Sequence, residues 1–347
     1  MEGAEQISGP FTLALGLGDV DHLEPLDGYA REMTAATEQM LADGVDALEV
    51  TQAVAHVNDV LTARLLELTE ARFGPPPYAY SWLALGSHGR GEQVLSSDQD
   101  SALAWGGPRL HPGDPGEYFG RLSETVVSAL ARAGIPRCTG DYMASAWHHP
   151  LETFTEYFSR WVNDPKPSDL LKAEIFLDVR PVHGDLDVGR LDDILVAGGR
   201  RGSFLMQMAR ATVTFRPPLT FLGHVRTDHG YLDIKRRGTA AIVLLARLYA
   251  LAAGSNARTT LLRLQVAGRA GTLSPAGVEQ LTDAYRLLTE LRLRHQVEQA
   301  RNGVPVDNRV RVDALSAAQR KGLREAIRSV RVVQEITANR YQTHTVT

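Results

Sequence analysis

The sequence has 347 residues, which is enough for two or three packed units with a sizeable buried core. Its 37 basic and 41 acidic residues give a formal net charge of −4, which provides no long-range attraction for DNA. A single cysteine, Cys138, excludes an internal disulfide and a zinc centre of several thiolates, so we expect a reducing, cytoplasmic setting. We also expect no membrane association, because there is neither a signal peptide nor an apolar run long enough to cross a bilayer.

The N-terminal part of the chain is predicted to be helical. Good helix formers dominate from residue 26 to about residue 72, and their apolar residues recur at helical spacing. This pattern predicts two helices that are broken near Gly44. The run Gly74-Pro75-Pro76-Pro77 cannot continue a helix and therefore ends this segment.

Strand-like segments follow. The aromatic and aliphatic run over residues 78–85 predicts a first strand. Residues 101–105 predict a second strand that ends at the turn signal Gly106-Gly107-Pro108. A helix is predicted from about residue 116 to residue 133. Strand, turn, strand and helix together indicate a small domain built on a mixed sheet.

Beyond Pro150 the pattern becomes almost wholly helical. Apolar residues recur at helical spacing near residues 151–163, 168–179, 187–214, 236–253, 258–269, 275–301 and 315–340. The predicted fold class is therefore α+β. We expect an N-terminal helical segment (1–73), a small mixed-sheet domain (74–150) and a C-terminal helical-bundle domain that binds substrate (151–347).

The most informative segment runs from Gly86 to Asp100 and reads GSHGRGEQVLSSDQD. Glycines around Ser87, directly after a strand, let backbone amides approach a phosphate closely. Asp98 and Asp100 stand two apart at the head of a predicted strand, so their side chains project from one face. Both carboxylates can then bind one divalent metal ion, and Mg²⁺ prefers carboxylate and phosphate oxygens.

This combination predicts in-line transfer of a nucleoside monophosphate from a nucleoside triphosphate (NTP). The expected metal is Mg²⁺, with Mn²⁺ as an alternative. Gly86, Ser87 and the adjacent amides would hold the β- and γ-phosphates. Arg90 would either contact the same oxygens or pair with Glu92, which we also place in the predicted nucleotide site. A Gly-Ser pair or an Asp-x-Asp alone is usually an ordinary turn, but both together between two strands are much rarer by chance.

At these residues the chain resembles the nucleotidyltransferase superfamily of DNA polymerase beta, whose signature is Gly-Ser followed by Asp-x-Asp. The longer wording GSHGRGEQVLSSDQDSAL is similar to the signal-transduction nucleotidyltransferases of bacteria. That family is often fused to CBS and cyclic-nucleotide-binding domains and is related to the protein-PII uridylyltransferase. The resemblance runs from about residue 35 to residue 340. It implies a polymerase-beta-like sheet domain, ATP or UTP as the donor, and a regulatory protein as the acceptor of AMP or UMP.

Segments of the helical half resemble the same group: residues 175–185, 232–238 and 291–296, and the pair Asp307-Asn308. Asp233 and Lys235 match an Asn/Asp-x-Lys motif. The resemblance implies that Lys235 contacts the triphosphate from the opposite wall of a cleft between the two halves, with Asp233 holding the lysine or a ribose hydroxyl. The alternative is a solvated basic start of a helix, which Lys235 would share with Arg236 and Arg237.

The chain departs from the family pattern in two respects. Residues 1–70 are too short for a CBS pair, so any adenylate-sensing input must come from elsewhere. Asp141 stands where a second glycine is expected, which leaves the third catalytic carboxylate open. Asp141 is the first candidate for it, with a plain turn residue as the alternative. Asp178 is the rival, unless it forms a structural ion pair with Arg180.

Two other functions use the same residues. One is transfer to a small-molecule alcohol, which differs only in the acceptor pocket. The other is a regulatory nucleotide-binding module with slow or no turnover. Two metal-binding carboxylates argue against a pure binder, whereas a missing third carboxylate would argue for it. The sequence determines neither the preferred NTP nor the oligomeric state.

Overall fold

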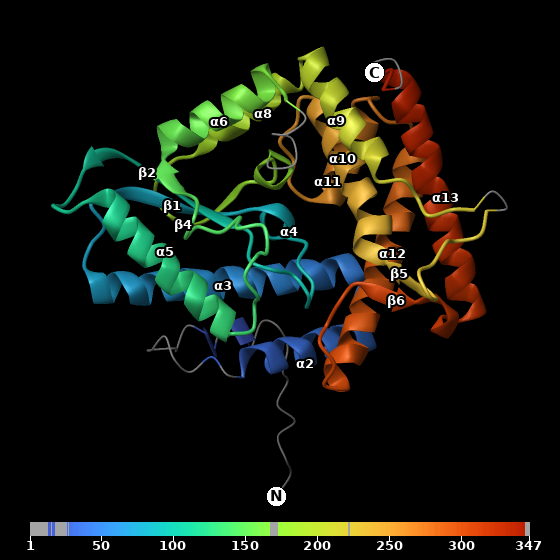
Figure 1. Cartoon of the computed structure of the whole chain (residues 1–347), viewed down its shortest axis with the longest axis horizontal. Helices are drawn as coiled ribbons and strands as arrows, with labels where there is room; N and C mark the ends of the chain where they lie inside the picture. Colours follow the sequence, from blue (N-terminus) through green and yellow to red (C-terminus); the bar gives the residue numbers. More distant parts are fainter. Residues whose placement is uncertain are drawn as a thin grey trace, which may run out of the picture. The chain divides into compact units, whose positions relative to one another are not determined.

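The computed structural model describes residues 13, 14, 16, 17, 26, 28–166, 173–220 and 223–343 (Figure 1). The chain divides into two compact units. Unit 1 comprises Met1–Thr155 and Ile175–Val188, and unit 2 comprises Glu156–Glu174 and Gly189–Thr347. Helices and a small mixed sheet make up the described part, so the predicted α+β class is confirmed.

Unit 1 combines helices with a four-stranded sheet. Its elements are α2 (Tyr29–Ala42), α3 (Ala47–Phe73), β1 (Tyr78–Ala84), α4 (Gly86–Gly89), β2 (Ser101–Arg109), α5 (Pro115–Arg132), β3 (His148–Pro150), the start of α6 (Leu151–Asn163) and β4 (Arg180–Gly184). The sheet order is β3-β2-β1-β4. Strand β1 is antiparallel to both β2 and β4, whereas β2 and β3 run parallel. The first two long helices, strand β1 and the start of β2 therefore follow the sequence prediction.

Side-chain caps set the starts of the two long helices that support the sheet. The Asp46 carboxylate accepts a hydrogen bond from the amide of Leu48 at the start of α3. Asp114 does the same for the amide of Glu117 at the start of α5. Each cap satisfies one amide that the first helical turn leaves without an intrahelical partner.

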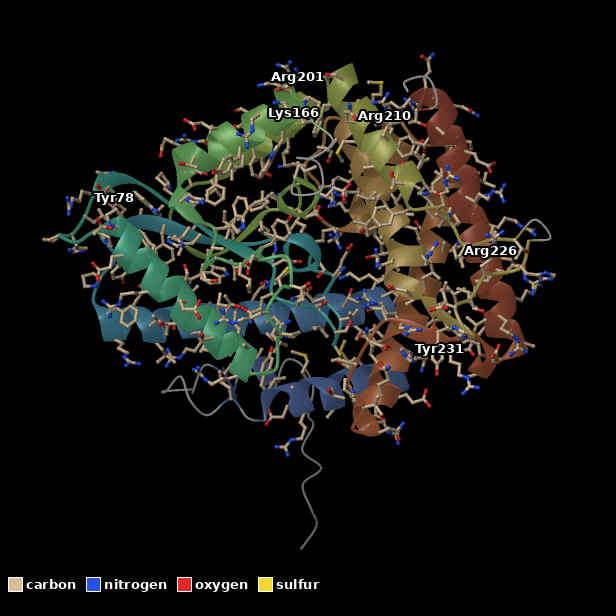
Figure 2. The ribbon with its side chains drawn as sticks, viewed as in Figure 1. Tyr78, Lys166, Arg201, Arg210, Arg226 and Tyr231 are labelled. Carbon is tan, nitrogen blue, oxygen red and sulfur yellow. The ribbon has the colours of Figure 1, made fainter. Side chains whose placement is uncertain are left out.

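The core of unit 1 lies between the sheet and helices α3 and α5 (Figure 1). Leu65 of α3, Trp82 of β1, Leu103 of β2 and Phe119 of α5 are all almost completely buried in it. Tyr80 and Trp82 belong to this core, and a shift of β1 by one residue would replace Trp82 there by Ser81 or Leu83. Strand β1 begins at Tyr78 (Figure 2). The centre of the Tyr78 ring lies 5.2 Å from that of Trp105.

Strand β2 is longer than the sequence predicts. The expected turn at residues 106–108 lies inside the strand, where the pairing with β1 shifts register between Tyr78 and Ala79. Gly107 has a φ of +82°, a conformation that glycine adopts without a steric penalty. The Gly-Gly-Pro signal therefore marks an irregularity within a strand pair rather than the end of a strand.

The prediction that the chain beyond Pro150 is almost wholly helical is wrong for residues 180–184. These residues form β4, which pairs with β1 at the edge of the sheet. The segment reads Arg-Pro-Val-His-Gly, with no alternating apolar pattern that would reveal a strand. Pro181 is tolerated because an edge strand does not need every amide for pairing.

Unit 2 is mainly helical. It contains the rest of α6, then α8 (Gly189–Gly198), α9 (Gly202–Thr214), β5 (Tyr231–Asp233), a π-helical turn (Lys235–Thr239), α10 (Ala240–Ala252), α11 (Thr260–Arg269), α12 (Pro275–Arg301), β6 (Arg309–Arg311), a 3₁₀ turn (Val312–Ala314) and α13 (Ala317–Arg340). The predicted helix over 187–214 is interrupted between α8 and α9. The two short strands β5 and β6 form an antiparallel ribbon that the sequence did not predict.

Helix α10 forms the centre of unit 2. Nearly all of its residues are buried, and it packs against α9, α11 and α13. A helix that is apolar on all sides requires such surroundings. Among the described residues, no helix is both long and apolar enough to span a membrane.

Two sequence motifs of the helical half meet at the β5–β6 ribbon. The amide of Ile234 donates to the carbonyl of Asn308 at 2.9 Å. The Asn308 side chain accepts a 2.6 Å hydrogen bond from Nε of Arg292 and a 3.2 Å bond from Gln296. Segments 232–238 and 291–296 are thus joined through the Asp307-Asn308 pair.

Candidate metal and nucleotide site

A tight turn connects β1 to the candidate site. Gly86 has a φ of +53° and starts the four-residue helix α4. The amides of Gly89 and Arg90 donate back to the carbonyls of Leu85 and Gly86. The first amides of a helix have no such partner, so they remain available to an anion. The half-buried Ser87 hydroxyl makes no hydrogen bond to any residue that the structure describes.

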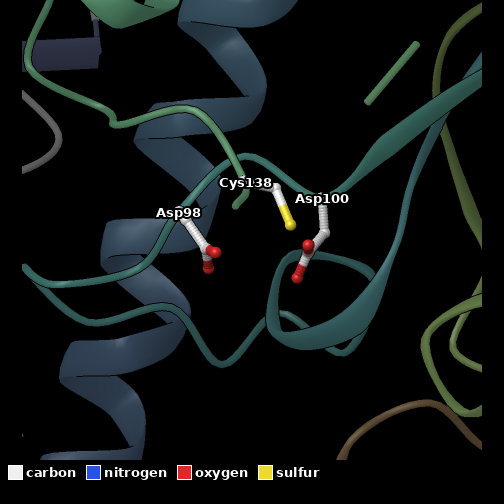
Figure 3. Close-up of side chains that lie close together, drawn as sticks. All are labelled: Asp98, Asp100 and Cys138. Carbon is white, nitrogen blue, oxygen red and sulfur yellow. The ribbon is translucent and has the colours of Figure 1, made fainter. Parts of the chain in front are cut away.

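Asp98 and Asp100 lie directly before β2 and project together. Gln99 between them is buried, and its side-chain amide donates to the carbonyls of Val127 and Ile135 at 3.1 and 2.8 Å. Because successive residues of an extended chain alternate in direction, anchoring Gln99 inward turns both aspartates to the opposite side. Their ligand oxygens and the Cys138 sulfur lie within 4.8 Å of one another (Figure 3).

The donor set of this group suits a hard divalent cation. Two half-buried carboxylates supply oxygen ligands of the kind that Mg²⁺ and Mn²⁺ prefer. Burial raises the pKa of the Cys138 thiol to about 11, and the charges of Asp100 and Asp98 also raise it. Thiol sulfur is moreover a soft ligand, whereas Mg²⁺ prefers oxygen ligands. Asp98 and Asp100 are the residues that could hold the ion.

Cys138 is the member of this group that sequence reasoning missed. Its approach depends on a bridge between Gln99 and Arg137, which brings a distant segment beside the aspartates. Asp141, the first candidate for a third carboxylate, is exposed in a turn with a φ of +58° and is not part of the converging group. Its catalytic role stays a prediction.

Arg90 is held by two carboxylates. Its Nε lies 2.7 Å from Oε2 of Glu92, and its Nη1 lies 2.5 Å from Oδ2 of Asp178. A pair with Glu92 is one of the two roles predicted for Arg90 from the sequence, and this pair is present. The predicted ion pair between Asp178 and Arg180 is wrong, because Asp178 pairs with Arg90 instead. The helix has ended by residue 176, and the fully buried Asp178 faces the turn that carries Arg90. Contact of Arg90 or Glu92 with nucleotide stays a prediction.

Asp233 and Lys235 belong to unit 2. Asp233 Oδ1 accepts a 2.9 Å hydrogen bond from the amide of Arg236, so this carboxylate caps the π-helical turn. Lys235 is exposed at the start of the same turn. Single π-helical turns occur frequently at functional sites.

Comparison with known families identifies both units. Residues 31–168 match the family described as "Putative nucleotidyltransferase DUF294", and residues 202–341 match "Putative nucleotidyltransferase substrate binding domain". The chain therefore matches both domain models of a "Putative nucleotidyltransferase" family, and each model covers less than half of it. The first match includes Asp98 and Asp100, and the second includes Lys235. No curated protein matches the chain.

The close approach of Gly86 to Asp100 gives a prediction for this candidate metal site. A Cβ on Gly86 would lie 2.6 Å from Oδ2 of Asp100, so Gly86→Ala must displace a predicted metal ligand. We expect the affinity for Mn²⁺ to fall by about tenfold or more, measured by calorimetric titration. Gly91→Ala is the matched control, since Gly91 also has a positive φ, +68°, but a Cβ there meets nothing. Equal Mn²⁺ affinity in the two variants would contradict the prediction.

Two partly buried carboxylates of unit 1, Asp59 and Glu70, predict its acid sensitivity. Burial tends to raise the pKa of Asp59, but hydrogen bonds from His88 and Arg180 outweigh it and hold that pKa below its usual range. Glu70 behaves similarly. Burial tends to raise its pKa, but hydrogen bonds from His183 and Tyr80 outweigh burial, so the pKa of Glu70 is also below its usual value. A lowered folded-state pKa contributes stability above the unfolded-state values, 3.8 and 4.5, and loses it as the pH falls through the folded-state pKa.

We therefore expect a free energy of unfolding that is little affected by these two groups above about pH 5 and that decreases progressively below about pH 4. Urea denaturation between pH 7 and pH 3 measures it. Replacing Asp59 by Asn should flatten the acid slope, and an unchanged slope would exclude Asp59 as a contributor.

Proposed function

We propose that this chain is a Mg²⁺-dependent nucleotidyltransferase that transfers AMP or UMP from ATP or UTP to a regulatory protein. The observation that carries the proposal is the convergence of the Asp98 and Asp100 carboxylates beside the Gly86–Ser87 turn. The turn offers amides and a hydroxyl to phosphate oxygens, and the carboxylates offer ligands to a divalent cation that would neutralise charge on the triphosphate. Both features lie in the domain that matches the nucleotidyltransferase family.

The residues of unit 1 then have distinct tasks. Asp98 and Asp100 hold the metal, which when bound would activate the attacking oxygen and neutralise charge on the leaving pyrophosphate. Ser87 and the amides of the turn orient the β- and γ-phosphates. Arg90 is held between Glu92 and Asp178, whose carboxylates balance its charge, so its part is to fix the end of the turn.

Asp141 remains the candidate base that accepts the proton of the attacking hydroxyl. Its rival Asp178 is fully buried and paired with Arg90, so it has no access to an acceptor. Asp141 is exposed and lies three residues from Cys138, which itself lies beside the metal-binding pair. A general base must come within hydrogen-bond reach of the proton it removes, and an exposed turn residue can do so as substrate binds.

The decisive experiment incubates the purified protein with each α-labelled NTP, Mg²⁺ and a lysate depleted of small molecules. A labelled protein band supports transfer to a protein acceptor, and this acceptor is suggested by the resemblance to the protein-PII uridylyltransferase. Label that moves to a low-molecular-weight alcohol only when small molecules are restored supports the alternative acceptor. If neither a protein nor a small molecule becomes labelled while the protein binds NTP tightly, the result would instead indicate a regulatory nucleotide-binding module.

Nucleotide affinity should depend mainly on the triphosphate and Mg²⁺. The turn and the carboxylates recognise groups common to all NTPs, and one neutral hydrogen bond to a base contributes only about 0.5–1.5 kcal/mol. We expect ATP, UTP, GTP and CTP to bind within about one to two orders of magnitude of each other. If Asp233 and Lys235 belong to the nucleotide site, Lys235→Ala should weaken all four equally. Calorimetric titration with and without Mg²⁺ tests this, and strong preference for one base or indifference to Mg²⁺ would contradict it.

A further inference from the structure

Asp59, which lies outside the sequence motif, contacts the Gly86–Arg90 turn through its carboxylate. Asp59 lies on α3, and its Oδ1 is 2.7 Å from Nε2 of His88, the central residue of the turn. The same carboxylate binds Arg180 of β4 through both oxygens, each at 2.9 Å from a guanidinium nitrogen. Asp59 thus joins a helix, the turn and an edge strand.

Arg180 extends this connection to the backbone of the turn. Its Nη2 donates to the carbonyl of His88 at 3.1 Å, and its Nε donates to that of Gly89 at 3.3 Å. His88 and Gly89 are the last two residues of α4, so these contacts hold the end of the short helix that contains Ser87. The bidentate pair with Asp59 fixes the plane of the guanidinium group and so fixes both contacts.

The fold of α3 does not depend on this carboxylate. Leu61 and Leu65 of the same helix are almost completely buried in the core of unit 1. Asp59 itself is partly accessible, with 22% of its side chain exposed. Loss of its charge should therefore leave the helix in place, while His88 and Arg180 lose the group that orients them.

We infer that Asp59 is a positioning residue for nucleotide transfer, acting through His88 and Arg180 on the turn that carries Ser87. The inference rests on the proposed function of that turn. Its physical basis is that phosphate-binding amides must be held within a fraction of an ångström, and a displacement of about 1 Å can reduce the rate by about 100-fold. A displaced Gly86 would also disturb Asp100, because Oδ2 of Asp100 lies 2.6 Å from the position that a Cβ on Gly86 would take.

The test compares Asp59→Asn with Glu67→Gln. Both changes remove one carboxylate from α3, but Glu67 is 52% exposed and, within the part of the chain that the structure describes, pairs only with Arg64 on the same helix. Hydrogen exchange of peptides covering residues 86–92 reports the order of the turn. Steady-state kinetics separates kcat from KM for the NTP, and thermal unfolding measures stability.

We expect D59N to accelerate exchange in residues 86–92 and to lower kcat/KM by about 10–100-fold, with a folded protein and a normal exchange pattern in the rest of α3. E67Q should match the wild type in all three measurements. A D59N protein that loses stability while its turn and its kinetics stay unchanged would overturn the inference, because Asp59 would then be merely structural.

Failure of the proposed function would appear differently, as a wild-type protein that transfers no nucleotide. In that case, calorimetric titration of Mg²⁺–ATP replaces the kinetic readout. Weaker Mg²⁺–ATP binding with faster exchange in D59N would still support positioning by Asp59, and unchanged values would reject it.

Discussion

Replacing Asp98 and Asp100 together by Asn should reduce metal-dependent transfer by at least about 1000-fold, since metal stabilisation of the transition state contributes several kcal/mol. The two carboxylates converge to within 4.8 Å, so both ligands are lost from one place. The fold should remain intact, because both residues are half-buried and no core contact is removed. Stability should hold or rise slightly, since two neighbouring carboxylates repel each other without an ion.

Single-turnover assays with labelled NTP measure the rate, and urea denaturation measures stability. E67Q is the control for removal of a carboxylate elsewhere in unit 1. Wild-type turnover by the double variant in Mg²⁺ would show that the site has been wrongly assigned. Retained Mn²⁺ binding by the double variant would lead to the same conclusion without depending on an acceptor.

Gly89→Ala should destabilise unit 1 by about 3 kcal/mol, the upper end of the usual cost of overpacking, because the added atom forces the backbone to move. A Cβ on Gly89 would lie 1.8 Å from the carbonyl oxygen of Asp178 and 2.8 Å from that of Ala84. Both obstacles are backbone atoms, and they cannot move aside as a flexible side chain could. The turn and the segment leading into β4 must therefore separate, which also breaks the Arg90–Asp178 pair.

The control is Gly202→Ala at the start of α9, where a Cβ meets nothing within 4 Å. Chemical denaturation of both variants gives the free energies of unfolding. Hydrogen exchange then locates the loss, which we expect in residues 84–92 and 176–184. Equal stability of the two variants would mean that the turn does not pack against Asp178 as described.

Local patterns in the sequence were sufficient for much of the architecture. Helices α6 and α12 begin and end at the predicted residues, and β1 lies within one residue of its predicted range. The Gly-Ser and Asp-x-Asp motif predicted two converging carboxylates after a glycine turn, and the converging pair is found. These features depend on residues close in the sequence: helical or strand periodicity, breaker residues and alternation along an extended chain. Because these interactions join residues that are close in the sequence, the sequence alone was enough to predict the features.

Contacts between distant residues decided the rest. Strand β4 exists because β1 offers a free edge, and its own five residues carry no strand signal. Asp178 pairs with Arg90, Arg180 pairs with Asp59, and Cys138 joins the two aspartates, all across long separations in sequence. A charged side chain has many partners of suitable charge along a chain of this composition. The packing of α3, the sheet and the turn decides which of these partners each charged side chain meets. Burial makes an unpaired charge costly, so each buried charge must lie beside a partner of opposite charge.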